Sequence, residues 1–218
     1  MKTSKIILIS FLSVFCLGLL SFMITTEKPK NETQLEYINQ KLPDFKVVRA
    51  SKNANVTLIT GDTCSIQYCI LKDSAVKHPY EIVADTLFLK PLKHGSKNAH
   101  YSIYLNKVHK IINDGGNLGI NLVQDSLNVT TINKGRLQFY DKSSLGVVHL
   151  KLYQNSKCFL FNDNIKNLIL DANNSKININ KRVSTVNLTA KNKANITLKS
   201  ANTLSAKCDS SSRFRIIN

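Results

Sequence analysis

The feature that most constrains this sequence is a repeat of short apolar pairs in its second half. After Gly115-Gly116, apolar residues separated by one position recur about every 19 residues, in two interleaved series. The first series comprises Leu118/Ile120, Leu137/Phe139, Cys158/Leu160, Ile177/Ile179, Ile196/Leu198 and Phe214/Ile216. The second comprises Leu127/Val129, Val148/Leu150, Leu168/Leu170, Val186/Leu188 and Leu204/Ala206. Two short strands per step are typical of stacked β-coils, so we predict a parallel β-helix whose paired apolar side chains point into one core.

Residues that tolerate a positive φ stand just before the first-series strands. Glycine adopts a positive φ freely, and asparagine does so more readily than other residues with a side chain. A coil must turn sharply between its strands, so these positions are predicted to be corners. The predicted corners are Gly115-Gly116-Asn117, Asn133-Lys134-Gly135, Asn155-Ser156, Asn173-Asn174-Ser175, Asn192-Lys193 and Ser210-Ser211-Ser212.

Short runs rich in β-branched and aromatic residues precede the repeats. They cover residues 45–50, 55–60, 65–71, 81–90 and 101–108, and turn signals separate them. No stretch after residue 24 keeps a 3.6-residue apolar period for long, so the fold class is predicted to be all-β. The polar residues 25–43 are predicted to form a spacer, with at most one helical turn at 35–38.

The N-terminus predicts insertion into a membrane. Lys2 and Lys5 precede 19 uncharged residues, 6–24, and a helix of that length is about long enough to cross a hydrocarbon core of ~30 Å. The apolar part of a cleaved secretory signal is shorter, about 7–15 residues, and ends at a small-x-small site that is missing here. We therefore expect 6–24 to be an uncleaved transmembrane anchor, with a cleaved signal segment as the alternative. Residues 1–5 would form a cytoplasmic tail, and the rest would lie outside the cytoplasmic membrane.

The charge balance points to anionic partners. The 218 residues include 30 Lys and Arg against 14 Asp and Glu, a formal net charge of +16. Such a surface attracts polyanions, and outside the cytoplasmic membrane these are anionic glycans or lipid headgroups rather than nucleic acid. Four basic residues precede first-series strands at similar coil positions and are candidates for one anion-binding ladder: Arg136, Lys157, Lys176 and Arg213. The alternative is that they are solvated side chains that protect sheet edges.

The remaining reactive side chains predict neither a metal site nor a cofactor. Four cysteines follow the anchor: Cys64, Cys69, Cys158 and Cys208. An oxidising compartment would permit disulfides, but all three pairings stay open, and the spacings fit no compact metal site. Some parallel β-helices cleave polysaccharides, which requires clustered acids. The acids after residue 117 share no predicted face, so no catalytic residue and no enzyme are predicted: Asp125, Asp141, Asp163, Asp171 and Asp209.

Three stretches carry a resemblance to a known family. They are "FKVVRASKNANVTLITGDTCSIQY" (45–68), "ADTLFLK" (84–90) and "YLNKVHKIINDGGNLGI" (104–120). They resemble the GIN domain family, the auto-transporter adhesin head domain of bacterial envelope proteins, although most corner glycines of that family are Asn, Ser or Lys here. The resemblance implies a right-handed β-helix over 44–218 and a location in the cell envelope. It implies no catalytic residues.

These observations together predict a membrane-anchored, non-enzymatic envelope protein whose β-helix head has a binding, structural or adhesive role. The alternative from another class is a signalling or assembly module that binds a protein partner. A polysaccharide-active enzyme is the third reading. The ligand and the oligomeric state stay open at this point.

Overall fold

The structure, a computed structural model, describes residues 35–71, 79–92, 99–161 and 164–217. These residues form 17 strands and no helix, which confirms the all-β prediction. The first nine strands are β1 (Leu35–Lys41), β2 (Val47–Ala50), β3 (Asn55–Thr60), β4 (Ser65–Leu71), β5 (Tyr80–Val83), β6 (Thr86–Leu89), β7 (Tyr101–Leu105), β8 (Lys110–Asp114) and β9 (Asn117–Asn121). The others are β10 (Val123–Ile132), β11 (Arg136–Phe139), β12 (Ser144–Leu152), β13 (Lys157–Leu160), β14 (Ile165–Asn173), β15 (Lys176–Lys191), β16 (Asn195–Cys208) and β17 (Arg213–Ile216).

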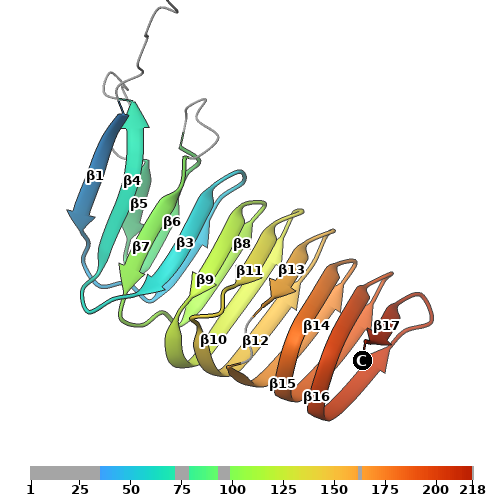
Figure 1. Ribbon diagram of the computed structural model, residues 1–218. Helices are drawn as coiled ribbons and strands as arrows, with labels where there is room; N and C mark the ends of the chain where they lie inside the picture. The colour runs from blue at the N-terminus through green and yellow to red at the C-terminus, as the bar shows by residue number, and fades with distance from the viewer. Residues whose placement is uncertain (1–34, 72–78, 93–98, 162–163, 218) are drawn as a thin grey trace, which may run out of the picture. The chain divides into compact units, whose positions relative to one another are not determined.

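The strands wind into a β-solenoid of about five coils, in which each coil pairs in parallel with the next (Figure 1). What we call the first face consists of β3, β9, β11, β13, the start of β15, the start of β16, and β17. The second face consists of β2, β8, β10, β12, β14 and the later parts of β15 and β16. Because β15 and β16 are long, each contributes to both faces.

The strand register confirms the two interleaved series. On the first face Leu118 pairs with Leu137, and Leu137 with Cys158. On the second face Val129 pairs with Leu150, and Leu150 with Leu170. The apolar members of both series are buried through β15 and form one continuous core. Only the last coil differs, since Ile216 stands at an inward position of β17 but is 54 % exposed.

Five of the six predicted corners contain a residue with a positive φ, as the sequence indicates, whereas Ser210-Ser211-Ser212 contains none. Asn133, Asn155, Asn174 and Asn192 all have a φ between 45° and 62°, and Gly115 has a φ of 74°. An L-residue in this region is strained by contact between its Cβ and the following carbonyl oxygen, and asparagine tolerates this better than most. At these four positions, asparagine is therefore a consequence of turning the coil.

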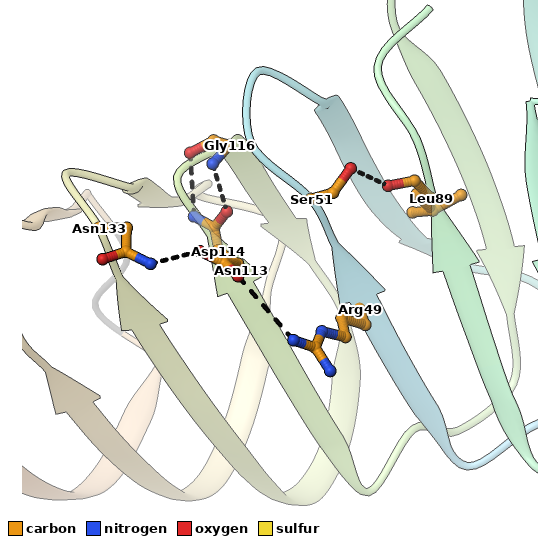
Figure 2. Close-up of polar contacts among 7 residues, drawn as sticks. All are labelled: Arg49, Ser51, Leu89, Asn113, Asp114, Gly116 and Asn133. Atoms are coloured by element: carbon orange, nitrogen blue, oxygen red, sulfur yellow. Dashed lines mark hydrogen bonds and ion pairs between the residues drawn. The ribbon is translucent and has the colours of Figure 1, made fainter.

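A buried asparagine holds the first of these corners in place. Asn113 Nδ2 donates to the Gly116 carbonyl oxygen at 3.1 Å, and its Oδ1 accepts from the Gly116 amide at 3.0 Å (Figure 2). Asn113 Nδ2 also donates to the Arg136 carbonyl oxygen at 2.9 Å. Beside it, Asn133 Nδ2 donates to Asp114 Oδ1 at 2.7 Å. Polar groups inside a core must be paired in this way, and here the pairing ties two successive coils together.

The part that precedes the repeats differs from the expectation in two places. Residues 35–41, assigned by sequence to a spacer with a helical turn, form β1, which pairs antiparallel with β4. The run 81–90, read as one strand, is an antiparallel hairpin of β5 and β6 that turns at Ala84, whose φ is 53°. Strands β7, β4 and β1 continue the first face beyond β3. The β5–β6 hairpin continues the second face, because β6 pairs in parallel with β2.

The cytoplasmic tail (1–5), the anchor (6–24) and the start of the spacer lie outside the described residues. Within residues 35–71, 79–92, 99–161 and 164–217 there is no helix of the length and hydropathy that a membrane crossing requires. The anchor therefore stays a prediction from the sequence.

Candidate functional site

The four predicted ladder residues occupy one column on the outer surface of the first face. Arg136 pairs with Lys157, and Lys157 with Lys176, so these three lie on adjacent coils. Lys176 pairs with Asn195, and Asn195 with Arg213, so the fourth cation lies two coils beyond Lys176. We call this set the basic column: Arg136, Lys157, Lys176, Asn195 and Arg213. Parallel pairing places neighbouring members about 4.8 Å apart at the backbone.

The alternation of the strands directs these side chains outward. In β13 Lys157 is exposed while Cys158 is fully buried, and in β15 Lys176 is exposed while Ile177 is fully buried. A shift of the register by one residue would bring the lysines inside. The apolar series and the corners therefore also set the position of the column.

The column has no acidic neighbour in the strand pairings of the first face. The next outward column along the strands consists of Thr57, Gly119, Gln138, Phe159, Asn178, Thr197 and Arg215. The ion pairs found among the described residues lie elsewhere, between Arg49 and Asp114 and between Lys90 and Glu81, each at 3.9 Å. Arg215 thus adds a fifth cation to this face, which the sequence did not single out.

An aromatic pair supports the start of the column. The guanidinium carbon of Arg136 lies 4.9 Å from the centre of the Phe159 ring. Phe159 in turn stacks on Phe161, with 6.3 Å between ring centres and 6° between their planes. A cation–π contact engages the flat face of a guanidinium. Since its N–H groups lie in the plane of that group, they stay available to an anion.

A hollow of about 380 Å³ adjoins the column on its β3 side. It spans β3, β9 and β11, and its polar lining consists of Asn55, Thr57, His100, Asn117, Arg136, Gln138 and Tyr140. Asn117 Nδ2 donates to Asn55 Oδ1 at 2.7 Å, and Asn55 Nδ2 donates to the Ala99 carbonyl oxygen at 3.2 Å. The two amides are thereby held in fixed orientations. No sequence pattern indicates this hollow, because its residues come from strands far apart in the chain.

The second face has a hollow of about 370 Å³ with a different character. Its lining includes the exposed Ile169 together with His149, Lys151 and Asp171. Asp171 accepts a hydrogen bond from the Tyr153 hydroxyl at 3.3 Å, and burial, with Asp171 second, raises the pKa of Tyr153. This face therefore combines both signs of charge, unlike the first.

The four cysteines are free thiols and are spread over the fold. Cys158 is fully buried beneath the basic column, and burial raises the pKa of its thiol well above the usual value. Burial, followed by a hydrogen bond with Asp44, raises the pKa of Cys64. Cys208 is exposed. In the described part of the chain, no three metal-binding side chains come together.

The acids that follow residue 117 do not gather where the structure describes them. Asp171 pairs in register with Lys151 and with Thr189, so neither neighbour on the second face is an acid. Asp209 lies at the last corner, where its oxygens accept from the backbone amides of Asn192 and Ser211. Asp163 lies outside the described residues. These carboxylates thus serve corners and coil surfaces.

Comparison with known proteins shows a shared fold. A "putative adhesin" from Bacteroides fragilis is 13 % identical with a TM-score of 0.57, over 84 % of this chain and 97 % of that one. A second "putative adhesin", from Parabacteroides distasonis, is 11 % identical with a TM-score of 0.52, over 85 % of this chain and 96 % of that one. No family model and no curated protein matches the sequence. At these identities the similarity establishes the architecture, a β-solenoid of the same kind as in two proteins from Bacteroidetes.

Proposed function

We propose that this chain is a non-enzymatic binding protein of the bacterial cell envelope that holds anionic polymers on its first face. The anchor 6–24 would keep it in the cytoplasmic membrane, with the solenoid outside. The proposal includes membership of the GIN domain family and the right-handed winding of the solenoid that this family implies. Right-handed winding agrees with the strong preference of parallel strand connections for that hand.

The observation that carries the proposal is the run of cations on adjacent coils, from Arg136 through Lys157 to Lys176. Two unit charges 4 Å apart repel by about 1 kcal/mol in water, and like charges on facing strand positions destabilise a sheet. Neither lysine has an ion pair within the described parts of the chain. A linear polyanion lying across the coils would offset this repulsion along the whole column.

A binding role also agrees with the comparisons and with the distribution of acids. Two proteins of the same fold are described as adhesins, which are binding proteins. Asp209 supports a corner and Asp171 stands between Lys151 and Thr189, so neither belongs to the carboxylate pair that glycosidic bond cleavage requires. Both observations favour binding without turnover.

The proposal is tested by charge reversal on the first face. Lys157→Glu combined with Lys176→Glu should abolish binding of the full chain to polygalacturonate and to polyphosphate at low salt. Binding of the unchanged chain should weaken as salt is raised, because salt screens exposed charges over about 10 Å at 0.1 M. Isothermal titration calorimetry at two salt concentrations measures both effects.

A matched control lies on the second face. Lys110 and Lys207 are also exposed, and their pairing partners are uncharged: Val47 and Asn128 for Lys110, and Thr189 for Lys207. Lys110→Glu combined with Lys207→Glu changes the net charge equally and should leave binding nearly intact. Equal loss in both double variants would mean that net charge alone attracts the polymer. Stoichiometric crosslinking to one envelope protein, with no polymer binding, would favour the assembly module instead.

A further inference from the structure

The hollow beside the basic column has the composition of a saccharide site. It combines an aromatic ring, three amide side chains and one guanidinium on a surface with no acidic lining residue. Recognition of a bare phosphate chain needs only cations, whereas a sugar ring presents hydroxyl groups and a weakly apolar face. A ring that also carries a carboxylate would engage each kind of group in this hollow.

The floor of the hollow is a position without a side chain. Gly119 stands between Thr57 and Gln138 in the outward column of the first face. A Cβ at Gly119 would lie 2.5 Å from Cε2 of Tyr140 and 3.3 Å from Oγ1 of Thr57. The Tyr140 ring therefore leans back over the preceding coil and packs against the backbone of Gly119. Only glycine permits this placement.

Tyr140 supplies the aromatic surface. It follows β11, is 38 % exposed and lines the hollow, so part of its ring contacts solvent. Aromatic side chains pack well against apolar surfaces, and a tyrosine keeps a hydroxyl for hydrogen bonding. With Gly119 beneath it, the ring is held as a fixed wall against which a flat sugar ring can stack.

The polar groups are placed around that wall in fixed orientations. The chain of bonds from Asn117 to Asn55 to the Ala99 carbonyl holds both amides before any ligand arrives. Asn117 thereby donates through Nδ2 and keeps Oδ1 as an acceptor for a hydroxyl group. Arg136 presents in-plane N–H donors while Phe159 covers its face, and a guanidinium binds a carboxylate through two parallel hydrogen bonds.

We propose that this hollow binds one uronic acid unit of an acidic glycan, with its ring against Tyr140 and its carboxylate on Arg136. This inference rests on the proposed function, because the basic column would bind the neighbouring acidic units of the same polymer. It goes further in committing to a sugar rather than to a phosphate chain. The hollow would give the first face its selectivity, and the column most of its affinity.

The test compares two polyanions on the full chain: a short oligogalacturonate and polyphosphate of similar charge. Tyr140→Ala and Gly119→Ala each remove the wall or displace it, and each should weaken oligogalacturonate binding about tenfold while leaving polyphosphate binding unchanged. Tyr140→Phe keeps the ring and should retain most of the affinity. Tyr104→Ala, an aromatic truncation on β7 outside the hollow, is the matched control and should alter neither ligand. Thermal melting of each variant checks that it is folded.

The outcomes separate this inference from the proposed function. If Tyr140→Ala and Gly119→Ala bind oligogalacturonate as the unchanged chain does, the hollow is no saccharide site, yet polyanion binding by the column stands. An equal loss for both ligands would also overturn the inference, because the hollow would then not distinguish sugar from phosphate. If the unchanged chain binds neither polymer, the proposed function fails and the inference fails with it. A methyl-esterified oligogalacturonate has no free carboxylate for Arg136. It should therefore bind weakly to the unchanged chain, and with the same affinity to Arg136→Gln.

Discussion

Lys157 and Lys176 are partners in the parallel pairing of β13 with β15, so two exposed cations are stacked one strand spacing apart. Because no acid stands in the same column, this arrangement is unfavourable in the absence of a ligand. Natural proteins retain such local costs where function requires them. The Lys157–Lys176 pair therefore couples the binding of an anionic ligand to the stability of the protein.

Neutralising one member of the pair should stabilise the free protein. Lys157→Gln removes repulsion from both Arg136 and Lys176 and should raise the free energy of unfolding by about 0.5 kcal/mol. Lys110→Gln, on the second face between uncharged partners, should change it by less. Denaturant unfolding of both variants measures the difference, and a loss of stability in Lys157→Gln would contradict the repulsion on which the proposal rests.

Replacing the corner residue Lys134 by glycine should not destabilise the protein. Lys134 has a φ of 64° and so pays the cost of the left-handed region, about 1 kcal/mol. Lys134→Gly relieves that cost and should leave stability unchanged or raise it. Lys142→Gly, at an exposed turn position without a positive φ, should instead destabilise by up to about 1 kcal/mol through greater freedom of the unfolded chain. Thermal unfolding separates the two, and equal losses would mean that the corner backbone is not strained.

A buried tyrosine joins the hairpin region to the core. The Tyr101 side chain is fully buried, and its hydroxyl donates to the Lys90 carbonyl at 2.7 Å and lies 3.0 Å from the Pro79 carbonyl. Burial raises the pKa of this phenol well above its usual value. Tyr101→Phe should cost about 1–3 kcal/mol, because it removes the hydroxyl that donates to the Lys90 carbonyl oxygen. Tyr104→Phe on the same strand, at a partly exposed position, serves as the control in chemical denaturation and should cost much less.

The thiols of Cys158 and Cys208 should differ sharply in reactivity. Cys208 is exposed, whereas Cys158 is fully buried with a raised pKa. Thiolate is the reactive form of cysteine, so a thiol reagent at pH 8 should modify Cys208 at once and Cys158 only as the coils open. Mass spectrometry over time assigns each site. Rapid modification of Cys158 in the native protein would contradict the core described above.

The last corner should depend on pH through Asp209. Hydrogen bonds, above all the one from the backbone amide of Asn192, lower the pKa of Asp209 from 3.8 to about 2. The amide and the hydroxyl of Ser211 also donate to this carboxylate. A group whose pKa falls on folding stabilises the folded state above its unfolded pKa, and this contribution is lost as the pH falls from about 3.8 towards 2. The amide resonance of Asn192 should titrate with a midpoint near 2. A midpoint near 3.8 would show that the corner bonds do not hold in solution.

The coils and the column could be predicted from the sequence because both depend on local periodicity. Alternation decides which residues point inward, and the fixed repeat length decides which outward residues stack. The stacking of Lys157 on Lys176 can therefore be predicted by counting residues along the repeat. The asparagines at the corners follow from the few side chains that tolerate a positive φ. The same count places Asn195 between Lys176 and Arg213 in the predicted ladder.

What the sequence did not reveal depends on contacts between distant segments. Strand β1 is polar and mostly exposed, so its burial pattern gives no signal, and only its pairing with β4 makes it a strand. The hairpin turn at Ala84 has no glycine or asparagine to mark it. The hollow requires that Tyr140 lie over Gly119 of the preceding coil, and no one-dimensional pattern encodes a side chain that leans across coils.

The central claim is that anionic polymers bind along the first face, and amide chemical-shift mapping during a titration with oligogalacturonate tests it most directly. The account predicts that the largest shifts fall on Arg136, Lys157 and Lys176 and on the lining of the hollow. The second-face amides of Lys110, Asn128 and His149 should stay unchanged. Shifts centred on the second face, or spread evenly over both faces, would contradict it.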